Sequence, residues 1–199
     1  MPSRTEIAIR RVIADVLPLL TEAGFRRSRR RFTRSIEPGV VQVVEFEAGR
    51  YPPPGMGWGE YGRFTINLGV WVDELRRADI TAEDGSTVGV AECHIQAQIG
   101  DLLRPSVDTW WEMFESTTAG SEARDALLRF GLPWLDGLRT RADILQAGDM
   151  GSGYSSHLLG LSTLDLARLY FAHDDRNSAA GLIAKYLAED LHPVHRRSL

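Results

Sequence analysis

The sequence predicts an α+β protein with an N-terminal helix, an antiparallel sheet of about four to five strands covered on one face, and C-terminal helices that include a helical hairpin. Apolar residues recur every three or four positions up to residue 23, alternate with polar ones between residues 25 and 72, and return to helical spacing beyond residue 118. Because a run of strands lies between helical segments, we expect one antiparallel sheet whose apolar face packs on the helices.

The first predicted element is a helix over residues 5–23. Its apolar residues fall on one face: Ile9, Val12, Ile13, Val16, Leu17 and Leu20. Gly24 supplies a stop signal, and Pro18 should kink the helix or mark a boundary within it.

The alternating region predicts strands over residues 30–36, 40–47, 63–72 and 93–99, with a short edge strand within 108–114. The first two strands flank a turn that contains proline and glycine, so they should form a β-hairpin. We expect Cys93, Ile95, Ala97 and Ile99 to point inward from the fourth strand.

The outward faces of strands 63–72 and 93–99 carry donors, acceptors and one aromatic ring, a mixture that suits recognition. The candidate ligand- or partner-binding residues are Arg63, Thr65, Asn67, Trp71, His94, Gln96 and Gln98. If the helices cover only the apolar face, this polar face is at least partly open. The proline- and glycine-rich loop at 52–62 stands at one end of it and could act as a flap.

Helical spacing returns in the C-terminal part. Residues 126–135 predict a helix that Gly131 and Pro133 should bend. Two further helices are expected over 162–172 and 177–189, the first with Ser162 and Asp165 at capping-box spacing. The short link between them predicts an antiparallel helical hairpin packed on the sheet domain.

The 199-residue length predicts a single domain over residues 1–199, with the helix and sheet core in 1–115 and the helical part in 116–199. Cys93 is the only cysteine, which fits a reducing compartment. The sequence shows neither a secretory signal nor a segment able to span a bilayer, and we expect a cytoplasmic protein. Of 23 basic residues only Lys185 is a lysine, a bias typical of G+C-rich bacterial genomes.

The motifs that suggest a cofactor or catalysis lie in predicted secondary structure that does not suit those roles. Residues 57–62 spell G-x-G-x-x-G, but a proline run precedes them and a strand follows, so we reject a dinucleotide site. The histidines lack metal-ligand spacing, and we predict no metal and no cofactor. Cys93 and His94 are adjacent on a strand and point to opposite faces, so Cys93 is interpreted as a small core residue.

An arginine cluster is the densest group of charge in the chain: Arg26, Arg27, Arg29, Arg30, Arg31 and Arg34, to which Arg10 and Arg11 could add. On a strand these side chains alternate between faces, so they should not all line one groove. The net charge of −4 also argues against general polyanion binding. We therefore favour a salt-bridged edge over the alternative of nucleic-acid binding.

Several segments resemble the bacterial domain of unknown function 4304 family. They are Gly24-Phe25, residues 31–34, 40–45 and 64–70, Cys93-His94, Ile99-Gly100, Trp110-Trp111 and residues 132–135. The resemblance covers roughly the first two thirds of the chain. It implies a bacterial cytoplasmic protein with no assigned activity, and it draws attention to Gln42, Asn67, Cys93 and Trp111 without giving them a role.

Three functional hypotheses follow. The first is a non-enzymatic recognition module that binds a protein partner, or a polar small molecule, on the open sheet face. The second is an enzyme, of hydrolase-like or other type, that uses His94 under the 52–62 loop with Arg63 holding an anion. The third is nucleic-acid binding through the Arg26–Arg34 cluster. We favour the first because converging titratable groups are absent, and the oligomeric state stays open.

Overall fold

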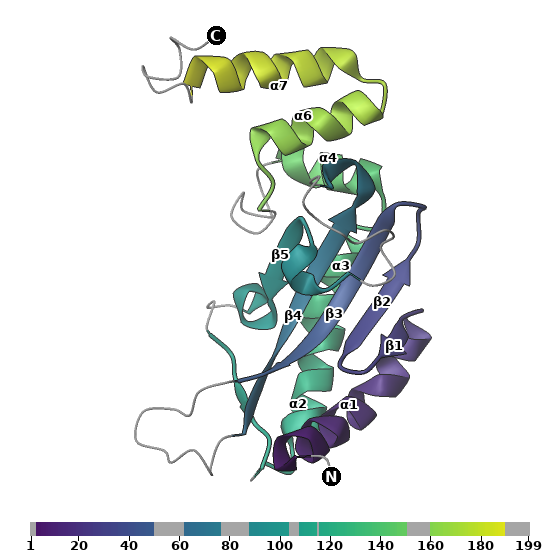
Figure 1. Ribbon diagram of the computed structural model, residues 1–199, viewed down its shortest axis with the longest axis vertical. Helices are drawn as coiled ribbons and strands as arrows, with labels where there is room; N and C mark the ends of the chain where they lie inside the picture. The colour runs from purple at the N-terminus through teal and green to yellow at the C-terminus, as the bar shows by residue number, and fades with distance from the viewer. Residues whose placement is uncertain are drawn as a thin grey trace.

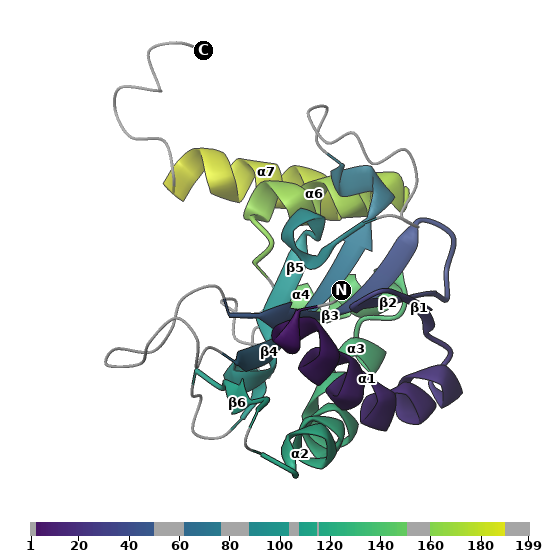
Figure 2. The same ribbon diagram turned by 60° about the horizontal axis from the view of Figure 1, so that its bottom comes forward.

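The computed structural model describes residues 3–49, 62–76, 88–103, 108–114, 116–150 and 160–189. The 52–62 loop therefore lies, except for Gly62, outside the described residues. An antiparallel sheet forms the middle of the molecule, with helices behind it and a helical hairpin, α6 and α7, beyond one end (Figure 1). Figure 2 shows α1 and α2 side by side beneath the sheet. The α+β prediction is confirmed.

Helix α1 (Arg4–Glu22) presents one apolar face to the sheet. Ser3 caps it by accepting a 3.1 Å hydrogen bond from the backbone N–H of Glu6. The helix continues through Pro18 to Glu22, and Gly24 follows with a positive φ of 86°, which glycine adopts without strain. The predicted helix and its stop are confirmed.

The sheet has the order β1-β2-β3-β4-β5 with every neighbouring pair antiparallel. Its strands are β1 (Arg26–Ser28), β2 (Arg31–Ser35), β3 (Val40–Ala48), β4 (Arg63–Val72) and β5 (Ile95–Gln98), and β6 (Trp111–Glu112) pairs with the start of β4. The predicted hairpin and the edge strand within 108–114 are thus confirmed. The sequence did not predict β1, and β5 starts two residues later than expected because η4 (Val90–Glu92) precedes it.

The helix-covered face carries the main apolar core. Alternate residues of β4, from Phe64 to Val72, pack with the apolar face of α1 and with the helices of the C-terminal part. One polar side chain, Gln42, lies among them. Its amide nitrogen donates to the carbonyls of Leu135 and Leu138, the latter at 3.0 Å, and its amide oxygen accepts from Arg34 Nε at 2.6 Å. These bonds tie the sheet to the chain that leaves α3 (Leu132–Asp136).

The helical part begins with three adjoining segments, α2 (Ala119–Ala126), η6 (Leu127–Gly131) and α3, of which η6 is a π-helix. Pro133 lacks a backbone N–H, and the wider turn directly before it is a common way to accommodate such a break. Helix α4 (Arg141–Met150) follows and was not predicted.

The predicted helical hairpin is confirmed as α6 (Thr163–Ala172) and α7 (Arg176–Glu189). Ser162 and Asp165 form the expected capping box, with Ser162 Oγ accepting from the Asp165 N–H at 3.1 Å. The hairpin contacts α4 and the short helix η2 (Asp73–Leu75) that follows β4, so it packs at the end of the sheet. In the described residues no helix has the length and hydropathy needed to cross a membrane.

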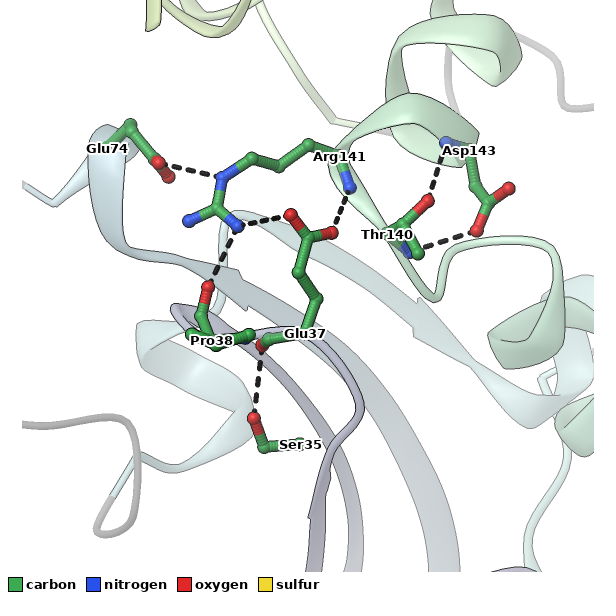
Figure 3. Close-up of polar contacts among 7 residues, drawn as sticks. All are labelled: Ser35, Glu37, Pro38, Glu74, Thr140, Arg141 and Asp143. Carbon is green, nitrogen blue, oxygen red and sulfur yellow. Dashed lines mark hydrogen bonds and ion pairs between the residues drawn. The ribbon is translucent and has the colours of Figure 1, made fainter. Parts of the chain in front are cut away.

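A polar node centred on Arg141 joins α4 to the sheet (Figure 3). The Arg141 guanidinium donates to Glu37 at 2.8 Å and to the Pro38 carbonyl at 2.8 Å, both in the β2–β3 turn, and to Glu74 of η2 at 2.7 Å. The Arg141 N–H also donates to Glu37 at 2.9 Å. Burial by itself raises the pKa of Glu37, but these bonds from Arg141 outweigh it and hold that pKa below its ordinary value.

Candidate functional site

The face of the sheet away from the helices carries a row of polar side chains that runs across four strands. Register places Arg31 opposite Glu45, Glu45 opposite Asn67, and Asn67 opposite Gln98. Neighbouring members are about 5 Å apart because that is the spacing between paired strands. The predicted alternation therefore places Asn67 and Gln98 together on one face.

Part of this face is covered, contrary to a simple open sheet. The segment Val88–Cys93 lies over it and forms a second apolar cluster with Val41, Val43 and Trp71. Contact is close enough that a Cβ at Gly69 would lie 2.6 Å from Cys93 Sγ. The segment is also tied down by a 3.0 Å hydrogen bond from the Val90 N–H to Glu45. Cys93 is therefore buried as expected, but in this second cluster and not in the main core with Ile95.

Of the predicted site residues, two are buried. Thr65 is 0% exposed and donates to the Thr109 carbonyl at 2.9 Å, while Trp71 is 1% exposed and donates to Asp73 at 2.6 Å. Neither side chain is accessible to a ligand in this structure. The physical reason is coverage by segments distant in sequence, which strand alternation does not report.

His94 and Arg63 lie at opposite ends of β4. His94 Nδ1 accepts the N–H of Val72 at 3.1 Å, and its ring packs on Trp71 with centroids 4.6 Å apart. Arg63 forms an ion pair with Glu112 of β6. A ten-residue strand is about 30 Å long, so the two side chains do not share a site. The lone pair of Nδ1 is occupied by a backbone bond, which suits a structural role better than a catalytic base.

The remaining candidates line a concavity of about 700 Å³, here called the polar groove. Its polar lining residues are Arg30, Glu45, Glu47, Asn67, Gln96, Gln98 and Asp101, and apolar residues that include Val90 and Ala91 complete the lining. Asn67 donates to Glu47 at 2.7 Å and Gln96 donates to the Cys93 carbonyl at 2.7 Å. Glu47, Gln96 and Asp101 are exposed. The groove therefore combines amide groups with exposed carboxylates.

A second concavity of about 1300 Å³, here called the arginine groove, lies beside the first and shares Arg30 and Glu45 with it. It is lined by Glu6, Arg10 and Ile13 of α1, by residues 27–31 of the β1–β2 hairpin, and by Glu45 of β3. Five arginines face two glutamates there, so positive charge is in excess. Sequence reasoning expected alternation to separate these arginines, but the turn at Arg29 and Arg30 interrupts the strand and brings four of them together.

Ion pairs neutralise part of this charge. Glu6 binds Arg30 and, at 3.0 Å, Arg10, and these bonds hold the pKa of Glu6 below its ordinary value. Arg31 reaches Glu45 at 3.3 Å. Arg34 points away from the groove and binds Asp136 at 2.5 Å and the Ala23 carbonyl at 2.9 Å. The favoured interpretation, a salt-bridged edge, thus describes Arg10, Arg30, Arg31 and Arg34.

Chemistry at the single thiol is disfavoured. Burial is the main cause that raises the pKa of Cys93, so the thiol stays protonated at neutral pH and is a poor nucleophile. Within the described ranges, no group of three or more His, Cys, Asp or Glu side chains is arranged to hold a metal ion.

With a meander of antiparallel strands backed by helices on one face, the chain is a mixed α+β protein, and its described residues include two adjoining grooves. A family model described as "Domain of unknown function (DUF4304)" matches residues 16–136. The chain belongs to this family. The match spans the sheet, α2 and α3 and stops before α4 and the hairpin. No curated protein and no solved structure matches the chain significantly.

Proposed function

We propose that the protein is a bacterial, cytoplasmic, non-enzymatic recognition module that binds an extended, positively charged segment of a protein partner in the polar groove. The observation that supports it is the register row of Glu45, Asn67 and Gln98, which sets one carboxylate and two amides side by side on the accessible part of the sheet. Side-chain amides can donate to and accept from peptide groups at once, as an extended segment requires.

The charges of the groove select the kind of segment. Glu47 and Asp101 are exposed carboxylates at its border, and the protein as a whole has a net charge of −4. Such a surface attracts lysine and arginine side chains and raises the association rate with a basic partner. Gln98, half-buried on β5 at the end of the row and part of the groove lining, is the position from which contact is best detected.

Photocrosslinking in cells of the source organism tests this proposal. A photoreactive phenylalanine analogue at Gln98 should capture a discrete partner peptide rich in Lys or Arg, and Glu47→Lys should abolish the capture by reversing a charge on the groove. The same analogue at Arg124, an exposed residue of α2, is the matched control. Adducts that are the same at Gln98 and Arg124, or that survive Glu47→Lys unchanged, would contradict the proposal.

A further inference from the structure

The arginine groove contains two guanidinium groups that no carboxylate of the described residues neutralises. Among the described residues, Arg27 and Arg29 form no ion pair, although Glu6 and Glu45 lie in the same groove and bind Arg10, Arg30 and Arg31. Arg27 Nε instead donates to the backbone carbonyl of Arg29 at 2.8 Å. Two exposed positive charges thus lie close together, one at β1 and one in the turn that follows it, where an anion can reach both.

The backbone of this turn adopts a conformation that arginine takes rarely. Arg29 has a φ of 57°, in the left-handed region, where a two-residue hairpin turn favours Gly, Asn or Asp. This conformation belongs to the turn whose Arg29 carbonyl accepts from Arg27. Strained residues of this kind are frequent at ligand sites, where the surrounding structure maintains them.

We propose that the arginine groove binds a compact anion with two or three linked phosphate groups, held chiefly by Arg27 and Arg29. Planar guanidinium groups donate two parallel hydrogen bonds to phosphate oxygens, and Ser28 adds a hydroxyl between them in sequence. A volume of about 1300 Å³ accommodates such an anion. Long nucleic acid fits less well because Glu6 and Glu45 border the groove and the chain is acidic overall.

Isothermal titration with inorganic pyrophosphate, tripolyphosphate and a nucleoside triphosphate at constant ionic strength tests the inference. Arg27→Ala combined with Arg29→Ala should weaken tripolyphosphate binding at least tenfold, since hydrogen bonds between charged groups are lost. Arg129→Ala combined with Arg139→Ala removes the same charge from two exposed arginines outside the groove and should leave binding unchanged. If a nucleoside triphosphate binds no tighter than tripolyphosphate, the groove recognises the phosphate groups and not the nucleoside.

A second variant separates ligand binding from folding. Arg29→Gly removes a guanidinium and also relieves the left-handed backbone, so it should raise the thermal midpoint while weakening tripolyphosphate binding. If the Arg27 and Arg29 double variant and the Arg129 and Arg139 double variant weaken binding equally, the effect is due to net charge alone and the inference is overturned. So would binding of single-stranded RNA without binding of any of the three compact anions. Because Arg27 and Arg29 do not line the polar groove, failure here leaves the proposed recognition function separately testable.

Discussion

The two faces of the sheet are both apolar in part, but they are covered by very different means. One face packs on α1, α2 and α3 through a large continuous core. On the other face, the part of the chain that the structure describes covers Val41, Val43 and Trp71 with the short segment Val88–Cys93. The difference shows that strand alternation assigns a residue to a face but does not determine what covers that face. The polar groove lies beside this segment, whose Val90 and Ala91 help to line it.

The largest expected effect breaks the polar link on the helix-covered face. Gln42→Leu leaves the carbonyls of Leu135 and Leu138 without their donor and removes the acceptor of Arg34, so unfolding free energy should fall by about 2–4 kcal/mol. Gln96→Leu, an exposed glutamine on the opposite face, should change stability by no more than about 0.5 kcal/mol. Urea denaturation measures both, and equal losses would contradict the contrast between the faces.

Two adjacent valines of β3 allow the same substitution to be compared on the two faces of the sheet. Val44 lies in the main core and Val43 in the second cluster, and both are 0% exposed. Val44→Ala should cost about 1.5–3 kcal/mol because its rigid surroundings leave a cavity. Val43→Ala should cost only about 1 kcal/mol, since the single segment above it can settle onto the smaller side chain. A larger loss for Val43→Ala would show that Val88–Cys93 is as rigid as the helices.

The sequence can predict the parts of this contrast that depend on neighbouring residues, but not the parts that depend on contacts between residues distant in the chain. The run Val40-Val41 and Val43-Val44 is apolar at consecutive positions, which is typical of a strand buried on both faces and could have predicted the second cluster. The cover itself could not be predicted, because Gly69 and Cys93 meet only through tertiary contact. Trp71 and Thr65 were assigned to the correct face and were nevertheless buried.

Local sequence patterns could have predicted one of the features that the sequence analysis missed, but not the other. Thr140 and Asp143 exchange the same capping bonds, at 2.9 and 3.1 Å, that predicted α6 from Ser162 and Asp165, so the missed helix α4 carried a usable signal. No local sequence pattern predicts the arginine groove. Its assembly depends on a left-handed arginine, a conformation that sequence rules assign to glycine or asparagine.

The smallest expected effect on stability concerns the β2–β3 turn, which Arg141 binds through Glu37 and Pro38. Glu37 has a lowered pKa, so its contribution to stability is complete above its ordinary pKa of 4.5 and is lost as pH falls through the lower value of the folded state. Glu37→Gln should cost about 1 kcal/mol at pH 7, and the difference from the unaltered protein should disappear by about pH 2. Thermal unfolding across this range measures it, and a difference that persists in acid would contradict the assignment.

The closeness of Cys93 to Gly69 makes the thiol a natural reporter of motion. Because the chain has one cysteine, and burial beneath η4 keeps it protonated, any thiol reagent can react only when that segment separates from β4. The labelling rate therefore measures how often the segment Val88–Cys93 opens, without an engineered probe. A change in this rate on adding a ligand tells whether occupancy of the neighbouring grooves holds the segment closed.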